Sequence, residues 1–243
     1  MNQTSLEPPL VSALVSTYSA AEWLPTRLDN LLEQTLADRL QIVVINSGSP
    51  ENENEIVRTY QRNHSNITYL RTQRENLPQA WNRGIELSTG KYLTHANTDD
   101  RLCSDALRQL VEKLEQRPDL ALVYADGWET HSKKDVINWK ETPTKHLVRR
   151  GEPLLRRLAA RCICGPQPVW RRSLHEDYGL FDTSFEVAAD WDFWLRIRVK
   201  EQFGYIPRPL GLYFHNPLGL EHGNQVVALA EAQRIRESFF QKR

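Results

Sequence analysis

The sequence has 243 residues, of which 40% are hydrophobic, and its 31 Lys and Arg residues balance 31 Asp and Glu residues. A chain of this length builds one large domain or two small ones with a sizeable hydrophobic core. A formal net charge of zero argues against bulk electrostatic binding to nucleic acid, and no apolar run reaches the roughly 20 residues that span a bilayer.

Three cysteines, Cys103, Cys162 and Cys164, are too few and odd in number for a disulfide framework. Residues 1–9 lack the apolar segment of a signal peptide. We therefore expect reduced thiols in a cytoplasmic protein. The C-terminal run 239–243 is a solvated helix end, a contact with a partner, or a peripheral contact at the inner face of a membrane. Nothing in the pattern indicates an oligomeric state.

Short apolar strands and amphipathic helices alternate through the first half of the chain. The expected strands are residues 11–15, 42–45, 67–71, 92–96 and 120–125. The expected helices lie between them, around residues 24–32, 51–63, 78–87 and 107–114, and Gly90 is expected to stop the third helix. This β-α-β-α series predicts a doubly wound, mainly parallel sheet that is flanked by helices.

The rhythm breaks after about residue 126, although no Gly/Ser-rich linker marks a boundary. Residues 140–152 are polar and basic and are expected to form a mobile loop. The later elements are expected to be a strand at 169–172, a helix at 191–200, a strand at 205–214 and a helix at 225–240. We predict a single domain over residues 1–243, with a first half at 10–125 and a smaller second half at 126–243.

An acidic pair, Asp99 and Asp100, directly follows the predicted strand at 92–96. Open α/β sheets bind their ligands at this end of a strand, and paired carboxylates suit Mg²⁺ or Mn²⁺. The alternative is that the two residues cap the next helix. The common phosphate motifs do not compete, because the chain has no GxGxxG and residues 84–91 fail the P-loop spacing.

Four segments occur in a recognisable order: VSALVSTY at 11–18, IVVINSGS at 42–49, NLPQAWNRGI at 76–85, and GKY at 90–92 before the acidic pair. Together they resemble family 2 glycosyltransferases of the GT-A fold, over about residues 10–220. The resemblance implies an inverting enzyme. It would move a sugar from a nucleoside diphosphate sugar, with a UDP-sugar favoured, to a hydroxyl of a saccharide or glycolipid in polysaccharide or glycoconjugate synthesis.

The resemblance also implies nucleotide contacts. Thr17 and Tyr18 would touch the nucleotide, Asn46 would lie near the base, and Arg83 would bind the diphosphate. Each also has a structural interpretation, as strand-end packing or a solvated helix face. Asp99 would bind the ribose or a water in the metal shell. The family usually has an acid where this chain has Asn46, which leaves the nucleotide base undetermined.

A metal ion, Mn²⁺ or Mg²⁺, is implied at the acidic pair. Asp100 would be its direct ligand, with Asp99 beside it, and His215 resembles a late family position near the diphosphate and the metal. A structural role for His215 remains the alternative. Asn97 occupies a position that is often Asp, and His95 is expected to serve packing or to support the acceptor loop.

The second half carries the implied catalytic base. Residues 188–196 (AADWDFWLR) resemble the family signature Glu-Asp-x-Asp-x-x-x-Arg, with Ala189 in place of the first acid. Asp190 would remove the proton from the attacking hydroxyl, or it would only cap the helix that follows. Asp192 is expected to pair with Arg196 four residues later. The tryptophans at 191 and 194 either pack in the core or stack on sugars.

Two other functions compete. A non-catalytic nucleotide-sugar or glycan-binding module is favoured by the replacement of three often-acidic positions by Asn46, Asn97 and Ala189. A sugar nucleotidyltransferase would need a Gly-rich basic segment after the first strand, whereas residues 16–21 read STYSAA. The glycosyltransferase interpretation ranks first because the carboxylates assigned to metal binding and to proton transfer are present.

Overall fold

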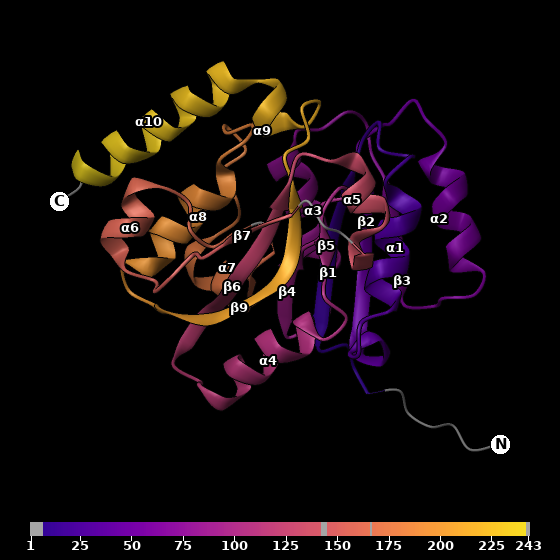
Figure 1. Ribbon diagram of the computed structural model, residues 1–243, viewed down its shortest axis with the longest axis horizontal. Helices are drawn as coiled ribbons and strands as arrows, with labels where there is room; N and C mark the ends of the chain where they lie inside the picture. Colours follow the sequence, from indigo (N-terminus) through magenta and orange to yellow (C-terminus); the bar gives the residue numbers. More distant parts are fainter. Residues whose placement is uncertain (1–6, 142–144, 166, 242–243) are drawn as a thin grey trace.

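Nine strands form one sheet flanked by helices in the computed structural model, which describes residues 7–141, 145–165 and 167–241 (Figure 1). The strand order is β3-β2-β1-β4-β8-β6-β9-β5, and β7 pairs with β6. The predicted α/β class with a mainly parallel sheet is confirmed. The sheet takes strands from both predicted halves, and the boundary after residue 125 falls inside β6 (Leu120–Thr130). The division into halves stays a prediction.

The first four neighbouring strands run parallel. They are β1 (Val11–Thr17), β2 (Leu40–Asn46), β3 (Ile67–Arg71) and β4 (Tyr92–His95). Every residue of β2 is buried, as expected for a parallel strand covered on both faces. The connections contain α1 (Leu24–Leu32), the 3₁₀ turn η1 (Ala37–Arg39), α2 (Glu53–Gln61) and α3 (Leu77–Leu87). Asn76 begins α3 with a capping box that it forms with Gln79.

The second half extends this sheet with antiparallel and parallel pairs. Strand β8 (Val169–Arg171) lies antiparallel between β4 and β6, and β9 (Gln202–Phe214) runs parallel to β6. The short strands are β5 (Arg101–Leu102) and β7 (His146–Val148). The helices are α4 (Ala106–Gln116), α5 (Lys133–Ile137), η2 (Trp139–Glu141), α6 (Leu155–Ala160), α7 (Leu174–Tyr178), α8 (Ala189–Arg198), α9 (Leu220–Gly223) and α10 (Gln225–Gln241).

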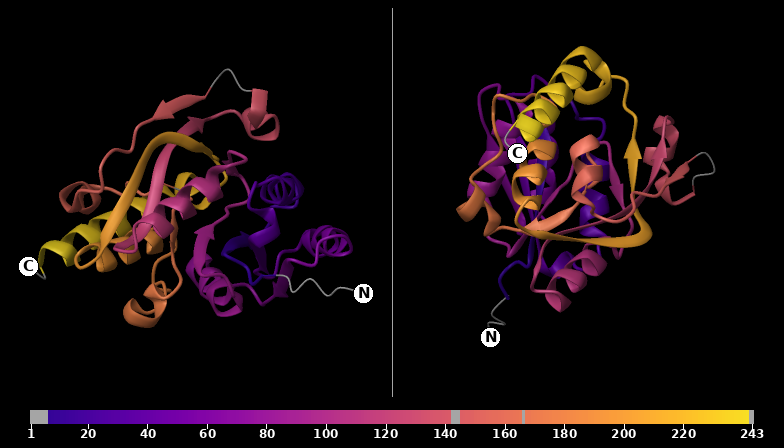
Figure 2. Two further views of the ribbon diagram at one scale, coloured as in Figure 1. Left: turned by 90° about the horizontal axis from the view of Figure 1, so that it is seen from below. Right: turned by 90° about the vertical axis from the view of Figure 1, so that its left-hand side faces the viewer.

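Two hydrophobic cores lie on the two faces of the sheet, because successive strand residues point to opposite sides. Leu14 of β1 packs in one core with α3 and α8, whereas its neighbours Ala13 and Val15 pack in the other with α1 and α4. Figure 2 shows the helices on both sides of the curled sheet. Helices therefore pack against both faces of the sheet.

The predicted long elements are confirmed to within a few residues, whereas several short ones were not predicted. Residues 140–152 were expected to be a mobile loop, but β7 forms within them and pairs with β6, while residues 142–144 lie outside the described part of the chain. Strand β5 and the helices α5, α6, α7 and α9 are too short to show a clear hydrophobic period. No helix in the described ranges is long and apolar enough to cross a bilayer.

Gly90 does not end α3, which terminates at Leu87 with Ser88 as its C-cap. Its position is fixed by a close approach of two backbones, because a Cβ at Gly90 would lie 2.7 Å from the nitrogen of Ser12 and from the carbonyl carbon of Val11. We expect Gly90→Ala to lower the free energy of unfolding by about 1–3 kcal/mol through overpacking. Urea denaturation checks this value. Gly223→Ala, where the nearest atom would be 3.4 Å away, serves as the control that should change little.

His95 is buried in an aromatic cluster at the end of β4, which confirms its packing role. Its ring stacks on Trp81 at 4.0 Å between centroids and meets Trp170 edge-on at 4.8 Å. Burial lowers the pKa of His95 from 6.5 to about 3, and it lowers the pKa of His175, in the same cluster, to about 4. Both rings are therefore neutral in the folded protein near neutral pH.

The unfolded chain binds protons at these histidines below pH 6.5, whereas the folded chain does not until near pH 3 or 4. Stability from the neutral rings is thus complete above about pH 6.5 and is lost as the pH falls from there. We expect His95→Phe to reduce the stability difference between pH 8 and pH 5 by up to about 2 kcal/mol. Urea unfolding at both pH values measures this, and His146→Phe, at an exposed residue of β7, should leave the difference unchanged.

Candidate functional site

The carboxyl ends of β1, β2 and β4 lie side by side at one edge of the sheet. Thr17 at the end of β1 is in register with Asn46 at the end of β2, and Leu14 of β1 is in register with His95 of β4. The loops that follow these three strands therefore meet at this edge. Open α/β sheets bind their ligands there.

The acidic pair follows β4 in a tight turn and is held by the end of β9. Oδ1 of Asp100 accepts the backbone N–H of Phe214 (3.2 Å), and Oδ2 accepts the side-chain amide of Asn97 (3.2 Å). Oδ2 of Asp99 accepts the side-chain amide of Asn216 (2.8 Å). Neither carboxylate caps the next helix, because β5 intervenes and Asp105 is the N-cap of α4. The capping interpretation is therefore wrong.

Two buried arginines support the backbone of this turn. Arg27 donates to the carbonyl of Asp100 (3.1 Å), and Arg101 donates to the carbonyls of Thr98 (2.8 Å) and Asp100 (2.6 Å). Burial lowers the pKa of Arg27 to about 9 and that of Arg101 to about 10, and both guanidinium groups stay charged at neutral pH. They bind the backbone of the turn and form no ion pair with either carboxylate in the described ranges, although their charges favour the ionised form of the acidic pair.

The electrostatics at Asp100 fit a cation site. Burial, together with the charge of Asp99, raises the pKa of Asp100 to about 8. In the described ranges neither carboxylate forms an ion pair, although Asp100 is only 1% exposed. A divalent cation bound here would favour the ionised form of both side chains. As they stand, no three His, Cys, Asp or Glu side chains among the described residues are arranged to hold a metal ion.

In the sequence, His215 lies between Phe214 and Asn216, which contact the acidic pair, but its own ring has other partners. Its Nε2 is 2.9 Å from the carboxylate of Glu129, and the ring stacks on His131 at 4.3 Å between centroids. Its backbone N–H donates to Thr130 (2.9 Å). The assignment of His215 as a metal ligand stays a prediction.

The loops after β1 and β2 are joined by Glu53, a residue that sequence reasoning missed. This fully buried carboxylate at the start of α2 accepts the backbone N–H of Ala20 (3.0 Å) and the hydroxyl of Ser49 (2.6 Å). The hydroxyl of Thr17 lies 3.5 Å from the same oxygen. In the sequence, Glu53 is marked only as an acid at the start of a predicted helix, and nothing there indicates its burial. Its effect is to hold the predicted nucleotide loops together.

The remaining predicted nucleotide residues differ in how free they are. Tyr18 is 43% exposed beneath the guanidinium of Arg74, 3.7 Å from its ring centre. Asn46 is fully buried, donates to the hydroxyl of Tyr69 (3.1 Å) and accepts the N–H of Ser49 (2.8 Å). Tyr18 is therefore partly exposed with Arg74 over its ring, whereas the amide of Asn46 shapes the loop.

Arg83 lies on α3 and is half exposed. Its guanidinium forms an ion pair with Glu75 (3.2 Å) and a longer one with Glu86 (3.7 Å). Neither partner belongs to the acidic turn. The structure thus gives Arg83 a local role on α3, and its diphosphate contact stays a prediction.

Asp190 lies in the first turn of α8. The N-cap is Ala188, so Asp190 is not the N-cap residue, although its carboxylate bonds an N–H of the first helical turn. Its Oδ1 accepts the N–H of Trp191 (2.7 Å). Burial raises the pKa of Asp190 to about 7, and the charge of Glu221 contributes to the increase. A carboxyl with this pKa is suited to accept a proton near neutral pH.

The rest of the α8 signature forms as expected. Asp192 pairs with Arg196 at 2.9 Å, and Trp191 and Trp194 are buried in the core. All three cysteines are free, and burial raises the pKa of Cys162 and of Cys164 well above the usual value.

Tyr213 of β9 connects the surroundings of the acidic pair with those of Asp190. Its hydroxyl donates to Glu221 (2.7 Å), and burial together with the charges of Glu221, Asp100 and Asp99 raises its pKa. The charge of Glu221 also raises the pKa of Asp190. Glu221 therefore interacts electrostatically with Asp190 and with Tyr213, and Tyr213 in turn interacts with the acidic pair. No sequence motif marked Tyr213 or Glu221, because their proximity arises only when β9 and α9 pack together.

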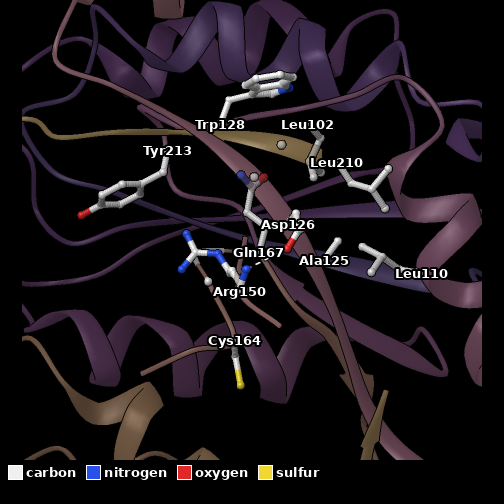
Figure 3. A pocket seen from close by; sticks show the side chains of 13 residues that line it. Leu102, Leu110, Ala125, Asp126, Trp128, Arg150, Cys164, Gln167, Leu210 and Tyr213 are labelled. Atoms are coloured by element: carbon white, nitrogen blue, oxygen red, sulfur yellow. Dashed lines mark hydrogen bonds between the residues drawn. The ribbon is translucent and has the colours of Figure 1, made fainter. Parts of the chain in front are cut away.

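A small cavity opens beside Tyr213 (Figure 3). It measures about 30 Å³ and is lined in part by Asp126, Arg150 and Gln167. Asp126 accepts the backbone N–H of Arg150 (2.7 Å) and the hydroxyl of Tyr205 (2.6 Å). A volume of this size holds a water molecule but not a sugar ring. The cavity is therefore not the donor site.

Comparison with solved structures supports the fold. The chain aligns with the mannosyltransferase PcManGT from Pyrobaculum calidifontis, solved with GDP-Man and Mn²⁺, at a TM-score of 0.69 and 22% identity, over 93% of this chain and 65% of the other. It aligns with residues 1–349 of S. aureus TarS, solved with UDP-GlcNAc, at a TM-score of 0.72 and 15% identity, over 95% of this chain and 71% of the other. These likenesses show the GT-A fold.

Sequence comparison gives the family. The chain is 28% identical over 218 residues to the uncharacterized glycosyltransferase EpsJ of Bacillus subtilis (strain 168), which covers 87% of this chain and 63% of EpsJ. The chain thus spans less than two thirds of this relative. The family model described as Glycosyl transferase family 2 matches residues 12–179, which include the acidic pair but end before Asp190. The chain belongs to glycosyl transferase family 2.

Proposed function

We propose that this protein is an inverting, metal-dependent glycosyltransferase that uses a nucleoside diphosphate sugar. One observation carries the proposal: Asp99 and Asp100 lie at the strand-end edge of the sheet with no ion-pair partner among the described residues, and Asp100 is buried. Such an edge is where GT-A-like sheets bind ligands, and oxygen ligands suit Mn²⁺ or Mg²⁺. The solved relatives with GDP-Man and UDP-GlcNAc support a nucleotide-sugar donor.

The donor is proposed to lie across the loops that follow β1, β2 and β4. Tyr18 offers an aromatic face for the nucleotide, and Glu53 keeps the first two loops in place. Asp100, with Asp99 beside it, would hold a divalent cation, and His215 is the further candidate ligand. When bound, the cation would neutralise charge on the leaving diphosphate. A UDP-sugar remains the favoured donor, and the acceptor is a hydroxyl of a saccharide or glycolipid.

Asp190 is proposed as the general base. An alcohol is a poor nucleophile at neutral pH, and a carboxylate within reach of its proton raises its reactivity. A single base is sufficient for direct displacement with inversion. With a pKa of about 7, Asp190 is ionised in about half of the molecules at neutral pH and accepts the proton as the acceptor oxygen attacks.

Calorimetric titration tests this proposal with UDP and GDP, each with and without Mn²⁺. Metal-dependent binding of one nucleotide is the expected result, followed by turnover of the matching donor, either UDP-GlcNAc or GDP-mannose, in a nucleotide-release assay. Binding without turnover of either donor or transfer to any offered saccharide would favour the glycan-binding alternative. Failure of both nucleotides to bind would contradict the donor site itself.

A further inference from the structure

One carboxylate from the C-terminal helix holds the start of α8. Glu231 of α10 is 8% exposed, and its Oε1 accepts the backbone N–H of Glu186 at 2.6 Å. Its Oε2 accepts the N–H groups of Val187 (3.0 Å) and Ala188 (2.9 Å). Three consecutive amides of the segment that leads into α8 therefore converge on one side chain, which lies 43 residues or more away in the sequence.

The three donors are the N-cap residue of α8 and the two residues that precede it. The first N–H groups of a helix lack partners within it, and a Ser, Thr, Asp or Asn at the N-cap usually satisfies one of them. The N-cap of α8 is Ala188, which has no side-chain acceptor. Glu231 satisfies the N–H of this N-cap residue and places a carboxylate near the positive end of the helix dipole, which is favourable, while Asp190 accepts an N–H of the first turn.

The rest of α10 fixes Glu231 relative to this segment. Arg234 donates to the hydroxyl of Ser184 (2.8 Å), and its guanidinium lies 4.1 Å from the centre of the Phe185 ring. Ile235 is 3% exposed in the core. Figure 1 shows α10 lying along α6 and α8. These contacts hold α10 against residues 184–188.

We propose that Glu231 is a positioning residue for the reaction, because it sets the orientation of the first turn of α8 and hence of Asp190. Asp190 follows Ala188 by two residues, so a shift of residues 186–188 moves its carboxylate. This inference rests on the proposed role of Asp190 as the base.

The experiment compares Glu231→Gln and Glu231→Ala with Glu237→Gln, at an exposed residue of the same helix. Hydrogen exchange followed by mass spectrometry should show faster exchange at residues 186–188 in both Glu231 variants and no change in the control. In the UDP-GlcNAc or GDP-mannose assay, kcat should fall by about 100-fold in Glu231→Ala, since displacement of a reacting group by about 1 Å costs that much. Glu231→Gln, which keeps one acceptor oxygen, should fall less.

The KM for the donor should stay within about twofold, because the donor loops lie on β1, β2 and β4. Unchanged exchange at residues 186–188, or wild-type kcat in Glu231→Ala, would overturn the inference. A fall in kcat that only matches a smaller folded fraction would also overturn it, since the role would then be structural. Asp190→Asn, measured in parallel, separates the role of Asp190 from that of Glu231. Wild-type turnover in Asp190→Asn would contradict Asp190 as the base. An inactive Asp190→Asn together with a fully active Glu231→Ala would contradict only the positioning role of Glu231.

Discussion

Asp100→Asn is expected to abolish Mn²⁺-dependent nucleotide binding and to lower turnover by about 10²–10³-fold. The substitution keeps the size of the side chain and an acceptor for the N–H of Phe214, but it removes the charge that would hold the cation. Loss of one electrostatic contact to a charge that develops in the transition state has effects of this order. Calorimetry with UDP and GDP, each with Mn²⁺, measures the binding, and nucleotide release from the donor measures the rate.

The fold should survive this change. Burying a carboxylate without an ion-pair partner costs free energy, so an amide at position 100 should leave the free energy of unfolding unchanged or raised. Asp105→Asn provides the matched control, because Asp105 precedes α4 and lies 3.6 Å from Arg108 at the surface. Equal Mn²⁺-dependent binding by Asp100→Asn and the control would show that the acidic turn does not bind metal.

Asp190→Asn is expected to lower kcat by about 10²–10⁴-fold while leaving nucleotide binding unchanged. Its physical basis is the loss of the proton acceptor, since an amide cannot take up the proton of the attacking hydroxyl. The wild-type protein should also lose activity as the pH falls through about 7, because the pKa of Asp190 is about 7 and only the ionised form accepts a proton. Steady-state rates between pH 5.5 and 8.5 measure this limb.

Asp192→Asn is the appropriate comparison for this variant. Asp192 lies on the same helix and pairs with Arg196, and a partly exposed pair of this kind contributes little to stability. The loss of activity as the pH falls through about 7 should persist in Asp192→Asn. It should be absent from the residual activity of Asp190→Asn. If the limb stayed in Asp190→Asn, a different group would control the pH dependence.

The local chemistry of the acidic pair was visible in the sequence, but its surroundings were not. A buried strand followed by two aspartates indicated a ligand site at a strand end, and the pair follows β4 at the edge of the sheet where β1 and β2 also end. Besides the nearby Asn97, the partners of the two carboxylates are Phe214 and Asn216, more than 100 residues later. Contacts over that separation leave no periodic signal in the sequence.

Glu53 and Glu231 illustrate a second limit. Each lies on a surface helix, where an acidic residue is ordinarily solvated. Its carboxylate is buried only because that helix, α2 or α10, packs against the rest of the fold. The sequence likewise indicated capping for Asp99, Asp100 and Asp190, since Asp favours such positions, but the caps are Asp105 and Ala188. Propensity describes a residue type, whereas burial depends on which elements pack around it.

By itself the sequence determined the class of the fold and the order of its long elements, because hydrophobic periodicity depends on neighbours within one helix or strand. It also carried the motifs of the family and the identity of the acids assigned to metal binding and proton transfer. Only the tertiary structure decided that β8 inserts antiparallel between β4 and β6, that Tyr213 bonds Glu221, and that Glu231 bonds the residues leading into α8. These features depend on side chains that meet across large sequence separations, where backbone periodicity carries no information.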